Sequence, residues 1–358
     1  MTLVRERRHQ QALRLTLPQS VGVFMNPSPV SSSSLLSSSS LSLASSSCSS
    51  SPANMDTLSN FRKLSVLGSG NGGIVYKVSH KQTGAIYALK VVRFSERDVG
   101  LVPAIREAEI LQRVDSSEYI VKCVGVFHDG SGFGFLMEYM DYGSLCDILC
   151  KKTRLSERAI SWIVRSVLKG LKYLHGLGIL HRDIKPSNLL VNARGEIKMA
   201  DFGASRVVAK ANVDRYSQEG DQSAYTCTSS RNNACKGTRA YMSPERMDPE
   251  QWDGEPCDDY AGDIWSLGVV AMECYMGRFP LVGEDEKLDW VTLMCVVCLG
   301  EKVESSILKM ASPEFESFCR RCLERNWRKR GTLDELLLHP FVNKFEDSGG
   351  DDLLNSSD

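Results

Sequence analysis

The chain has 358 residues, of which 42% are hydrophobic, and its 43 basic and 44 acidic residues leave a net charge of −1. This length suffices for one large globular domain or two medium ones. The balanced charge excludes the basic footprint of a nucleic-acid-binding protein, and no uncharged apolar run approaches the ~18 residues that cross a bilayer. We therefore expect a globular protein with neither a nucleic-acid nor a membrane partner. The sequence does not fix the oligomeric state, and we take a monomer as the default.

The N-terminal segment 1–55 differs in composition from the rest of the chain. Serine occupies most of the positions from Ser31 to Ser51. Such a segment cannot bury enough apolar surface to offset the entropy that is lost on ordering. We predict that residues 1–55 form a disordered leader.

Positions 5–17 of this leader combine a basic cluster with alternating apolar residues. An extended segment of this kind suits an acidic, apolar groove on a partner protein. The alternative is a transit peptide for a plastid or mitochondrion, because Glu6 is the only acidic residue before Asp56. The residues that would carry docking are Arg5, Arg7, Arg8, Leu13 and Leu15.

The segment 56–345 is predicted to form strands first and helices later. The strand-like patterns are FRKLSVLG, GIVYKVSH, AIYALKVVRF, IVKCVGVFH and FGFLMEYM, and one helical pattern, PAIREAEILQRV, lies among them. Ser156 can cap a long amphipathic helix that Gly176 and Gly178 end. Further helical patterns cover 264–275, 290–299 and 315–323.

These patterns predict an α+β fold with two lobes. A small β-rich lobe would span 61–140 and a larger α-helical lobe 141–345, with a ligand in the cleft between them. The polar residues 346–358 are predicted to form an acidic, disordered tail.

A glycine-rich segment, GSGNGG, lies between the first two strand patterns. Glycines let the backbone turn sharply and approach an anion closely, although a hairpin without a ligand is the alternative. Lys90 ends YALK within the third strand pattern, and Glu107 lies in the one nearby helix. Their ion pair could hold an ammonium group against phosphate oxygens, the alternative being a surface lysine. The loop residues are Gly68, Ser69, Gly70, Asn71, Gly72 and Gly73.

The segment HRDIKPSNLL places Asp183, Lys185 and Asn188 on one loop, and MADFG supplies Asp201 a short way further along the chain. Phosphoryl transfer needs a carboxylate that accepts the hydroxyl proton, a cation near the γ-phosphate and oxygen ligands for Mg²⁺. The four side chains supply each of these groups, so they predict a phosphoryl-transfer site.

The order of these motifs along the chain resembles that of eukaryotic protein kinases: the glycine loop, Lys90, Glu107, HRDIKPSN and DFG. The resemblance covers residues 56–345. It implies the two-lobed kinase fold with ATP and Mg²⁺ as cofactors. The implied roles are a catalytic base for Asp183, a γ-phosphate contact for Lys185, metal ligands for Asn188 and Asp201, and an ion pair for Lys90 and Glu107.

The same resemblance implies roles for residues around these motifs. Val75, Ala88 and Leu190 would enclose the adenine, Met137 would be the gatekeeper, and Glu138 to Met140 would form the hinge. In the helical lobe, Glu245 of the SPE motif would pair with Arg330. Asp263 would brace the catalytic loop, and His181 would pack beneath the Asp201 loop.

A finer resemblance is to the mitogen-activated protein kinase kinases. GSGNGG, HRDIKPSNLL and GTRAYMSPER are similar to the motifs of this group, and MTLVRERRHQ before a serine-rich leader is similar to its plant members. The resemblance implies a serine/threonine/tyrosine kinase that modifies Thr and Tyr of a TxY segment in a MAP kinase. It also implies an upstream MAP kinase kinase kinase, leader docking on the MAP kinase, and a cytoplasmic protein that can also be nuclear.

The activation loop would span 201–245. In such kinases the arginine beside the catalytic base, here Arg182, orders a phosphorylated loop. The second phosphorylated position of the family falls on Ala234, which cannot carry phosphate. The first would be Thr228 by plant spacing or Ser230 by animal spacing. The stretch from DFG to GTRAY is long for the family, so an insertion that shifts the register at Ala234 is the alternative.

The twelve cysteines lack the dense spacing of a secreted disulfide scaffold, and no apolar signal-peptide core follows the basic start, so we expect free thiols in a reducing compartment. Cys295–Cys298 and Cys319–Cys322 have zinc-site spacing. Both pairs fall on apolar helical patterns, which favours buried thiols that pack as small hydrophobic side chains.

Three functions stay open at this point. The first is an active dual-specificity kinase whose loop needs one phosphate or none. The second is a catalytically weak, ATP-binding scaffold of a MAP kinase cascade, which Ala234 favours and the intact catalytic positions oppose. The third is a serine/threonine kinase outside the cascade whose leader directs it to an organelle.

Overall fold

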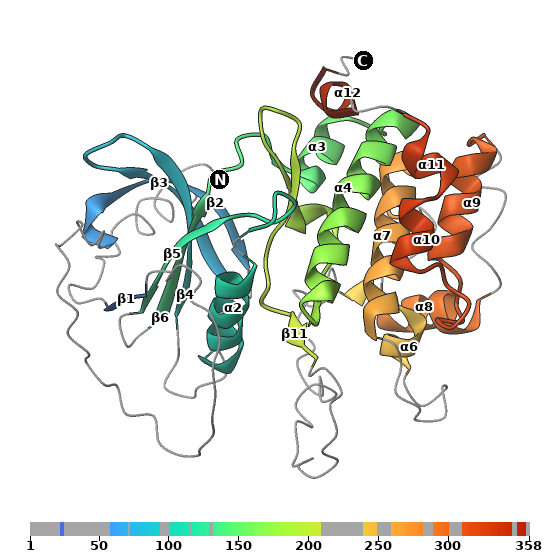
Figure 1. The fold of residues 1–358 in the computed structure, drawn as a ribbon, viewed down its shortest axis with the longest axis horizontal. Coiled ribbons are helices and arrows are strands. Elements are labelled where there is room, and N and C mark those ends of the chain that lie inside the picture. Colours follow the sequence, from blue (N-terminus) through green and yellow to red (C-terminus); the bar gives the residue numbers. More distant parts are fainter. Residues whose placement is uncertain are drawn as a thin grey trace, which may run out of the picture.

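The computed structural model describes residues 22–24, 58–70, 72–93, 101–114, 116–128, 132–208, 239–248, 259–281, 289–300, 310–345 and 349–355. Figure 1 shows a lobe built on a β-sheet beside a lobe of packed helices, so the predicted two-lobed α+β fold is confirmed. The docking segment 5–17, Asn71, and the loop positions Thr228, Ser230 and Ala234 lie outside the described residues.

The sheet lobe contains one antiparallel sheet with the strand order β1-β5-β6-β4-β3-β2. Helix α2 packs against β5 and β6. A cluster of buried apolar side chains that includes Phe61, Val78 and Leu89 fills the interior of the sheet lobe. The elements are β1 Gly22–Phe24, η1 Leu58–Asn60, β2 Phe61–Gly70, β3 Gly73–His80, β4 Ile86–Arg93, α2 Leu101–Arg113, β5 Cys123–His128 and β6 Gly132–Glu138.

Strand β1 belongs to the leader and pairs with the edge strand β5, in the register Val23 to Phe127. The prediction of disorder throughout 1–55 is therefore wrong for 22–24. An edge strand presents a row of backbone groups that any extended segment can pair with. A strand this short leaves no alternating pattern in the sequence.

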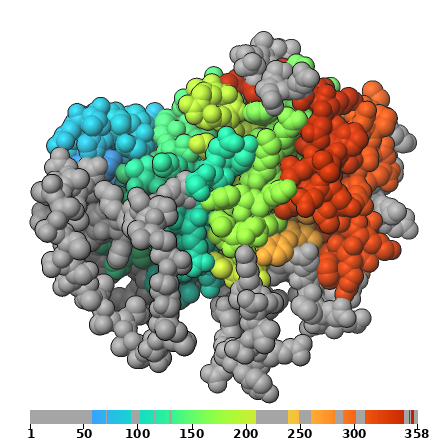
Figure 2. All heavy atoms as spheres, viewed as in Figure 1, coloured from blue at the N-terminus to red at the C-terminus, as the bar shows by residue number. Residues whose placement is uncertain are grey.

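The helical lobe is built around α4, Glu157–Gly176. The Ser156 side chain caps this helix by accepting a hydrogen bond from Ala159 N, and the apolar residues at helical spacing are buried, so the predicted helix is confirmed. α4 packs against α7, α10, α11 and α12. Figure 2 shows the C-terminal helices, in red, directly against the green surface of α4.

The other elements of this lobe are short strands and helices that surround α4 and α7. They are β7 Gly143–Ser144, α3 Leu145–Lys151, β8 Ile179–Leu180, η2 Pro186–Asn188, β9 Leu189–Val191, β10 Ile197–Met199, β11 Arg206–Val207, α6 Pro244–Met247, α7 Asp259–Met276, α8 Trp290–Met294, η6 Cys295–Leu299, α9 Pro313–Cys322, α10 Leu333–Leu337, α11 Pro340–Asn343 and α12 Gly349–Asn355.

Three of the four cysteines in the two CxxC pairs are buried packing residues, as expected. Cys298, Cys319 and Cys322 are buried and Cys295 is exposed. Burial raises the pKa of Cys319 and of Cys322, which keeps both side chains as neutral thiols. Within the described ranges, no group of three or more His, Cys, Asp or Glu side chains has the arrangement of a metal site, and no helix is long and apolar enough to span a bilayer.

Helix α12 corrects the prediction of a disordered tail over 346–358, which is wrong for 349–355. Leu353 is buried against the helical lobe, and Lys152 Nζ donates a hydrogen bond of 2.7 Å to its carbonyl oxygen. Gly350 lies so close to Gly195 that a Cβ at Gly195 would come within 2.6 Å of its Cα. The acidic composition concealed a helix that is held by tertiary packing rather than by its own propensity.

Replacing Leu353 by Asp should detach α12 and leave the rest of the domain folded. Exposing one buried leucine removes about 2 kcal/mol of packing free energy, which so short a helix cannot replace. Hydrogen exchange at 349–355 should therefore become fast, with the protection of α4 unchanged. The control is Asp352→Ala, which removes only a long, exposed contact to Arg158. Unchanged exchange in Leu353→Asp would contradict the packing of α12.

Candidate functional site

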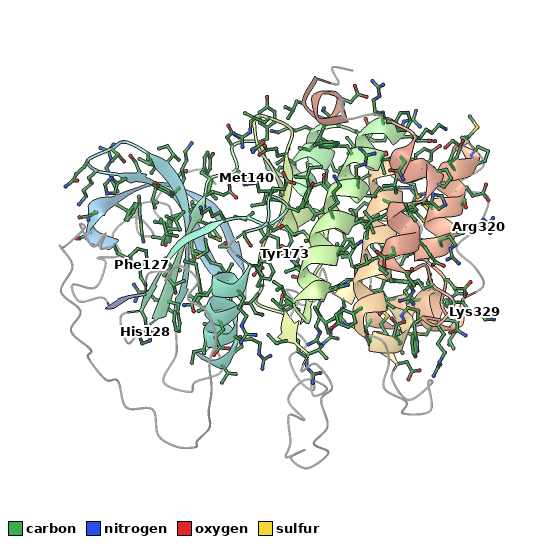
Figure 3. All side chains as sticks on the ribbon, viewed as in Figure 1. Phe127, His128, Met140, Tyr173, Arg320 and Lys329 are labelled. Atoms are coloured by element: carbon green, nitrogen blue, oxygen red, sulfur yellow. The ribbon has the colours of Figure 1, made fainter. Side chains whose placement is uncertain are left out.

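The candidate site lies where β3, β4 and β6 face the β9–β10 hairpin and the loops around Asp183 and Asp201. Met140 lies at the connection between the sheet lobe and the helical lobe (Figure 3). Cross-strand partners of an antiparallel sheet share a face. The register pairs Val75 with Lys90 and Ala88 with Met137. These four side chains therefore stand on one face of the sheet.

Lys90 is the centre of the charged part of the site. Its Nζ lies 2.6 and 2.9 Å from the two carboxylate oxygens of Glu107 and 2.7 Å from Asp201 Oδ1. β4 supplies Lys90, α2 supplies Glu107, and the segment after β10 supplies Asp201. Lys90 and Glu107 are buried, so the expected ion pair is present and the alternative of a surface lysine does not hold.

The charges of this cluster stabilise one another. Burial works to lower the pKa of Lys90, but the carboxylates of Asp201 and Glu107 outweigh it and raise that pKa above its ordinary value. Burial works to raise the pKa of Asp201, but the Lys90 ammonium lowers it below its ordinary value. Lys90 is therefore a cation and Asp201 an anion at neutral pH.

Asp183 is oriented by two side chains of its own loop. Lys185 Nζ donates to Asp183 Oδ2 at 2.7 Å, and Asn188 Nδ2 donates to the same oxygen at 2.9 Å and to the Asp183 carbonyl at 2.8 Å. The short helix η2, which Pro186 begins, brings Asn188 back toward Asp183. Within the described residues Asp183 Oδ1 accepts no hydrogen bond, so it is the oxygen that can take a proton.

The buried carboxylate of Asp263 on α7 braces this loop, as expected. It accepts hydrogen bonds from His181 N at 2.9 Å and Arg182 N at 2.7 Å, and it lies 3.1 Å from His175 Nε2. Arg182 and Asp201 both have a φ of 67°, an unfavourable conformation for residues other than glycine. Backbone hydrogen bonds to a fixed carboxylate hold Arg182 in this conformation.

His181 packs against Phe202 of the Asp201 loop, with ring centroids 5.2 Å apart, as expected. Its side chain is fully buried, and burial lowers its pKa. His181 is therefore a neutral packing residue.

The glycine loop fits a close approach by an anion. Gly73 has a φ of +107°, and a Cβ there would lie 2.3 Å from Val91 O, so the chain itself requires glycine. A Cβ at Gly68 or Gly70 would meet nothing within 4 Å. The protein's own packing therefore does not require glycine at these two positions, whereas a phosphate group close to the backbone would.

The metal-ligand positions also fit their expected group. In the part of the chain that the structure describes, neither the side-chain oxygen of Asn188 nor Asp201 Oδ2 accepts a hydrogen bond. Amide and carboxylate oxygens are the ligands that hard divalent cations prefer. Together with the glycine loop, this donor set fits a nucleoside triphosphate with a divalent cation.

Lys198 on β10 was missed by the sequence analysis. Its Nζ lies 2.8 and 2.9 Å from the carboxylate oxygens of Glu138. A single lysine in a very short strand forms no motif, so no signal in the sequence could have shown this contact. Leu67, which precedes Gly68 on β2, is 46% exposed, and the sequence analysis did not include it.

Glu245 and Arg330 form a buried ion pair beneath the site, as expected. Arg330 Nη1 and Nη2 lie 2.8 and 2.9 Å from the two carboxylate oxygens of Glu245. Arg330 also donates to the carbonyl oxygens of Ala261, Glu324 and Arg325. The pair joins α6, which follows the activation loop, to the turn before α10.

Replacing Arg330 by Met should destabilise the domain by about 3–5 kcal/mol, because the Glu245 carboxylate would stay buried without its cation. The free energy of unfolding from chemical denaturation measures this. The matched control is Arg320→Met, which removes a half-exposed pair with Glu316 and should cost about 1 kcal/mol or less. Adding Glu245→Gln to Arg330→Met should recover part of the loss. Equal effects of the two arginine variants would contradict the prediction.

Comparisons with known proteins agree with this geometry. Residues 61–342 match the protein kinase domain. The chain is 45% identical to mitogen-activated protein kinase kinase 10 of Arabidopsis thaliana over 96% of this chain and 99% of the relative. It is 42% identical to mitogen-activated protein kinase kinase 9 of the same plant, again over 96% and 99%. It is 44% identical to mitogen-activated protein kinase kinase 7 of Arabidopsis thaliana, over 80% of this chain and 86% of the relative. The chain therefore belongs to the protein kinase family and, within it, to the plant mitogen-activated protein kinase kinases.

Proposed function

We propose that this kinase transfers the γ-phosphate of ATP, bound with Mg²⁺, to both Thr and Tyr of a TxY segment in a MAP kinase. The observation that carries the proposal is the orientation of Asp183, whose Oδ2 is held by Lys185 and Asn188. Asp183 Oδ1 would accept the proton of the substrate hydroxyl as the hydroxyl oxygen bonds to the γ-phosphorus, while the bond from that phosphorus to the β,γ-bridging oxygen breaks and ADP leaves. The same arrangement would serve a Thr and a Tyr hydroxyl, and the choice of both rests on the likeness to MAP kinase kinases.

The neighbouring side chains have distinct tasks in this proposal. Lys185 would neutralise charge on the transferred group, and Lys90, fixed by Glu107, would bind phosphate oxygens. Asn188 and Asp201 would hold Mg²⁺, which supplies further charge neutralisation between the phosphates when it is bound. Val75, Ala88 and Leu190 would contact the adenine, beside Met137 and the hinge at 138–140.

We also propose that control by the activation loop is atypical. Ala234 stands at the second phosphorylation position, so at most the first position, Thr228 or Ser230, can carry phosphate. A phosphate there would pair with Arg182, whose backbone N–H is fixed by the buried Asp263. One modification, or none, would then suffice for activity.

The proposed partners are a MAP kinase, which segment 5–17 would bind, and an upstream MAP kinase kinase kinase. The combination of basic and apolar residues in 5–17 supports the proposed binding of this segment to a MAP kinase. We propose a monomer in the cytoplasm and nucleus. A mature N-terminus beyond Ser51 would instead indicate a transit peptide.

The dephosphorylated protein, given ATP and Mg²⁺, should phosphorylate both Thr and Tyr of the TxY segment in kinase-dead MAP kinases, because Asp183, Lys185 and Lys90 are in place. Mass spectrometry locates the phosphates. Lys90→Met is the control and should give no signal, since the phosphate contact and the partner of Glu107 are both lost.

Absence of product, even after treatment with an upstream kinase, would overturn the proposal. If ATP still bound, a scaffold role in the cascade, which Ala234 favours, would replace it. Phosphate on Ser or Thr of other proteins only would place the kinase outside the cascade.

Thr228→Asp or Ser230→Asp should raise the activity of the dephosphorylated protein, because a carboxylate near Arg182 imitates part of the charge of one phosphate. Ala234→Ser should add a second increase that depends on the upstream kinase. Initial rates on a kinase-dead MAP kinase measure both effects. If none of the three variants differed from the parent protein, the account of loop control would be wrong.

A further inference from the structure

Glu138, the last residue of β6, is bonded through its side chain to two other segments. Its Oε1 accepts a hydrogen bond of 2.7 Å from Lys122 N, and its two oxygens lie 2.8 and 2.9 Å from Lys198 Nζ. Its backbone N–H also donates to Lys122 O at 3.0 Å. One carboxylate thus joins the end of β6, the segment before β5 and strand β10.

Lys198 connects this carboxylate to the β9–β10 hairpin. Lys198 is the cross-strand partner of Leu190, so the two side chains stand on the same face of the hairpin. Leu190 is the residue proposed to contact the adenine from the helical lobe. Asp201 follows Lys198 by three positions along the chain.

Backbone hydrogen bonds hold the same strand from its other side. Met199 N donates to Tyr119 O and Val121 N donates to Met199 O, both at 2.9 Å. β10 is therefore attached to the segment 119–122 through its backbone and to Glu138 through Lys198. The two attachments fix the position of the hairpin relative to the end of β6.

We infer that Glu138 and Lys198 are positioning residues for the nucleotide. Their ion pair sets the separation between the hinge, which would bind one side of the adenine, and Leu190, which would bind its face. This inference rests on the proposed function, because it takes the adenine to lie between the sheet lobe and β9. Neither side chain touches the transferred phosphate in this arrangement.

The neighbouring ion pairs indicate whether loss of the Glu138–Lys198 pair should weaken or strengthen nucleotide binding. The Glu138–Lys198 pair is present together with the Lys90–Glu107 and Lys90–Asp201 contacts. Loss of the pair should therefore loosen a nucleotide site that is already formed. The side chains of Lys198 and Glu138 are only 12% and 27% exposed, so solvent screens this pair less than a surface pair.

The hairpin also provides a matched control. Arg194 and Glu196 form an ion pair in its turn, and their side chains are 73% and 41% exposed. Their charges act on Glu138 and Lys198 only through space, because among the described residues neither side chain is hydrogen-bonded to that pair. Arg194→Met therefore removes a salt bridge from the same hairpin without changing the attachment of β10 to Glu138.

The experiment compares Glu138→Gln, Lys198→Met, their double variant, Lys198→Arg and Arg194→Met. Steady-state kinetics give kcat and the KM values for ATP and for a kinase-dead MAP kinase. Calorimetry with Mg²⁺ and ADP measures nucleotide affinity without any protein substrate. Thermal unfolding shows that each variant is folded.

Each single variant should raise the KM for ATP and weaken ADP binding about five- to tenfold, with kcat and the KM for the MAP kinase within about twofold of the parent. The double variant should bind ADP no more weakly than the more impaired of the two single variants, because both substitutions remove the same ion pair. Lys198→Arg and Arg194→Met should behave as the parent protein does.

Unchanged nucleotide affinity would overturn the inference. A similar loss of kcat, of affinity for the MAP kinase and of affinity for the nucleotide would also overturn it, because it would indicate a structural role only. A gain in kcat or in nucleotide affinity would also overturn it, because the pair would then restrain the lobes. If the variants weaken ADP binding while the parent protein modifies no TxY segment, the inference stands and the proposed dual specificity fails.

Discussion

The buried Lys90 ammonium is the interaction on which the rest of the site depends. An unpaired charge at this depth would be strongly destabilising, so Lys90 requires the carboxylates of Glu107 and Asp201 near it. These two partners come from α2 in the sheet lobe and from the segment after β10 in the helical lobe. The cluster therefore forms only when both lobes and α2 are correctly placed, and it couples the geometry of the site to the fold.

The β9–β10 hairpin is the element of the helical lobe that positions Asp201 next to Lys90. Its strand β9 begins directly after Asn188, and its strand β10 ends just before Ala200 and Asp201. Trp162 on α4 donates a hydrogen bond of 2.8 Å to Gly195 O in the hairpin turn, and Gly350 on α12 contacts the same turn. The central helix, the C-terminal helix and the hinge thus all contact the hairpin that lies between the two proposed metal ligands, Asn188 and Asp201.

The chemistry of the site could be predicted from the sequence, because phosphoryl transfer limits which residue types can stand at each position. Lys90, Glu107 and Asp201 were found from motifs, and the structure joins them in one ion-pair cluster. Asp183 was found in the same way, and Lys185 and Asn188 hold its side chain. The long helix over 157–176 was also predictable, since its apolar residues recur strongly at helical spacing. The two lobes followed from the order of strand and helix patterns.

Features that depend on single long-range contacts could not be predicted. α12 is a short acidic segment that is helical because Leu353 packs against the helical lobe. β1 is a strand because β5 presents an edge to it. Lys198 and Glu138 are ordinary charged residues, far apart in the sequence, until the fold brings their charged groups to 2.8 Å. None of these contacts leaves a period or a motif in the sequence.

The backbone around Arg182 shows how loop control can act on this preassembled site. Asp263 fixes the amide groups of His181 and Arg182, and Arg246 Nη1 and Nη2 donate to the Arg182 carbonyl oxygen at 3.2 Å. The catalytic loop is thus held by buried groups of α7 and by Arg246 of α6. A phosphate on the activation loop would therefore not need to move Asp183 into place. It would act on the guanidinium of Arg182 and on the loop itself, and for that task one charged group is enough in principle. The buried brace of the catalytic loop is thus compatible with the proposed control through a single phosphorylation position.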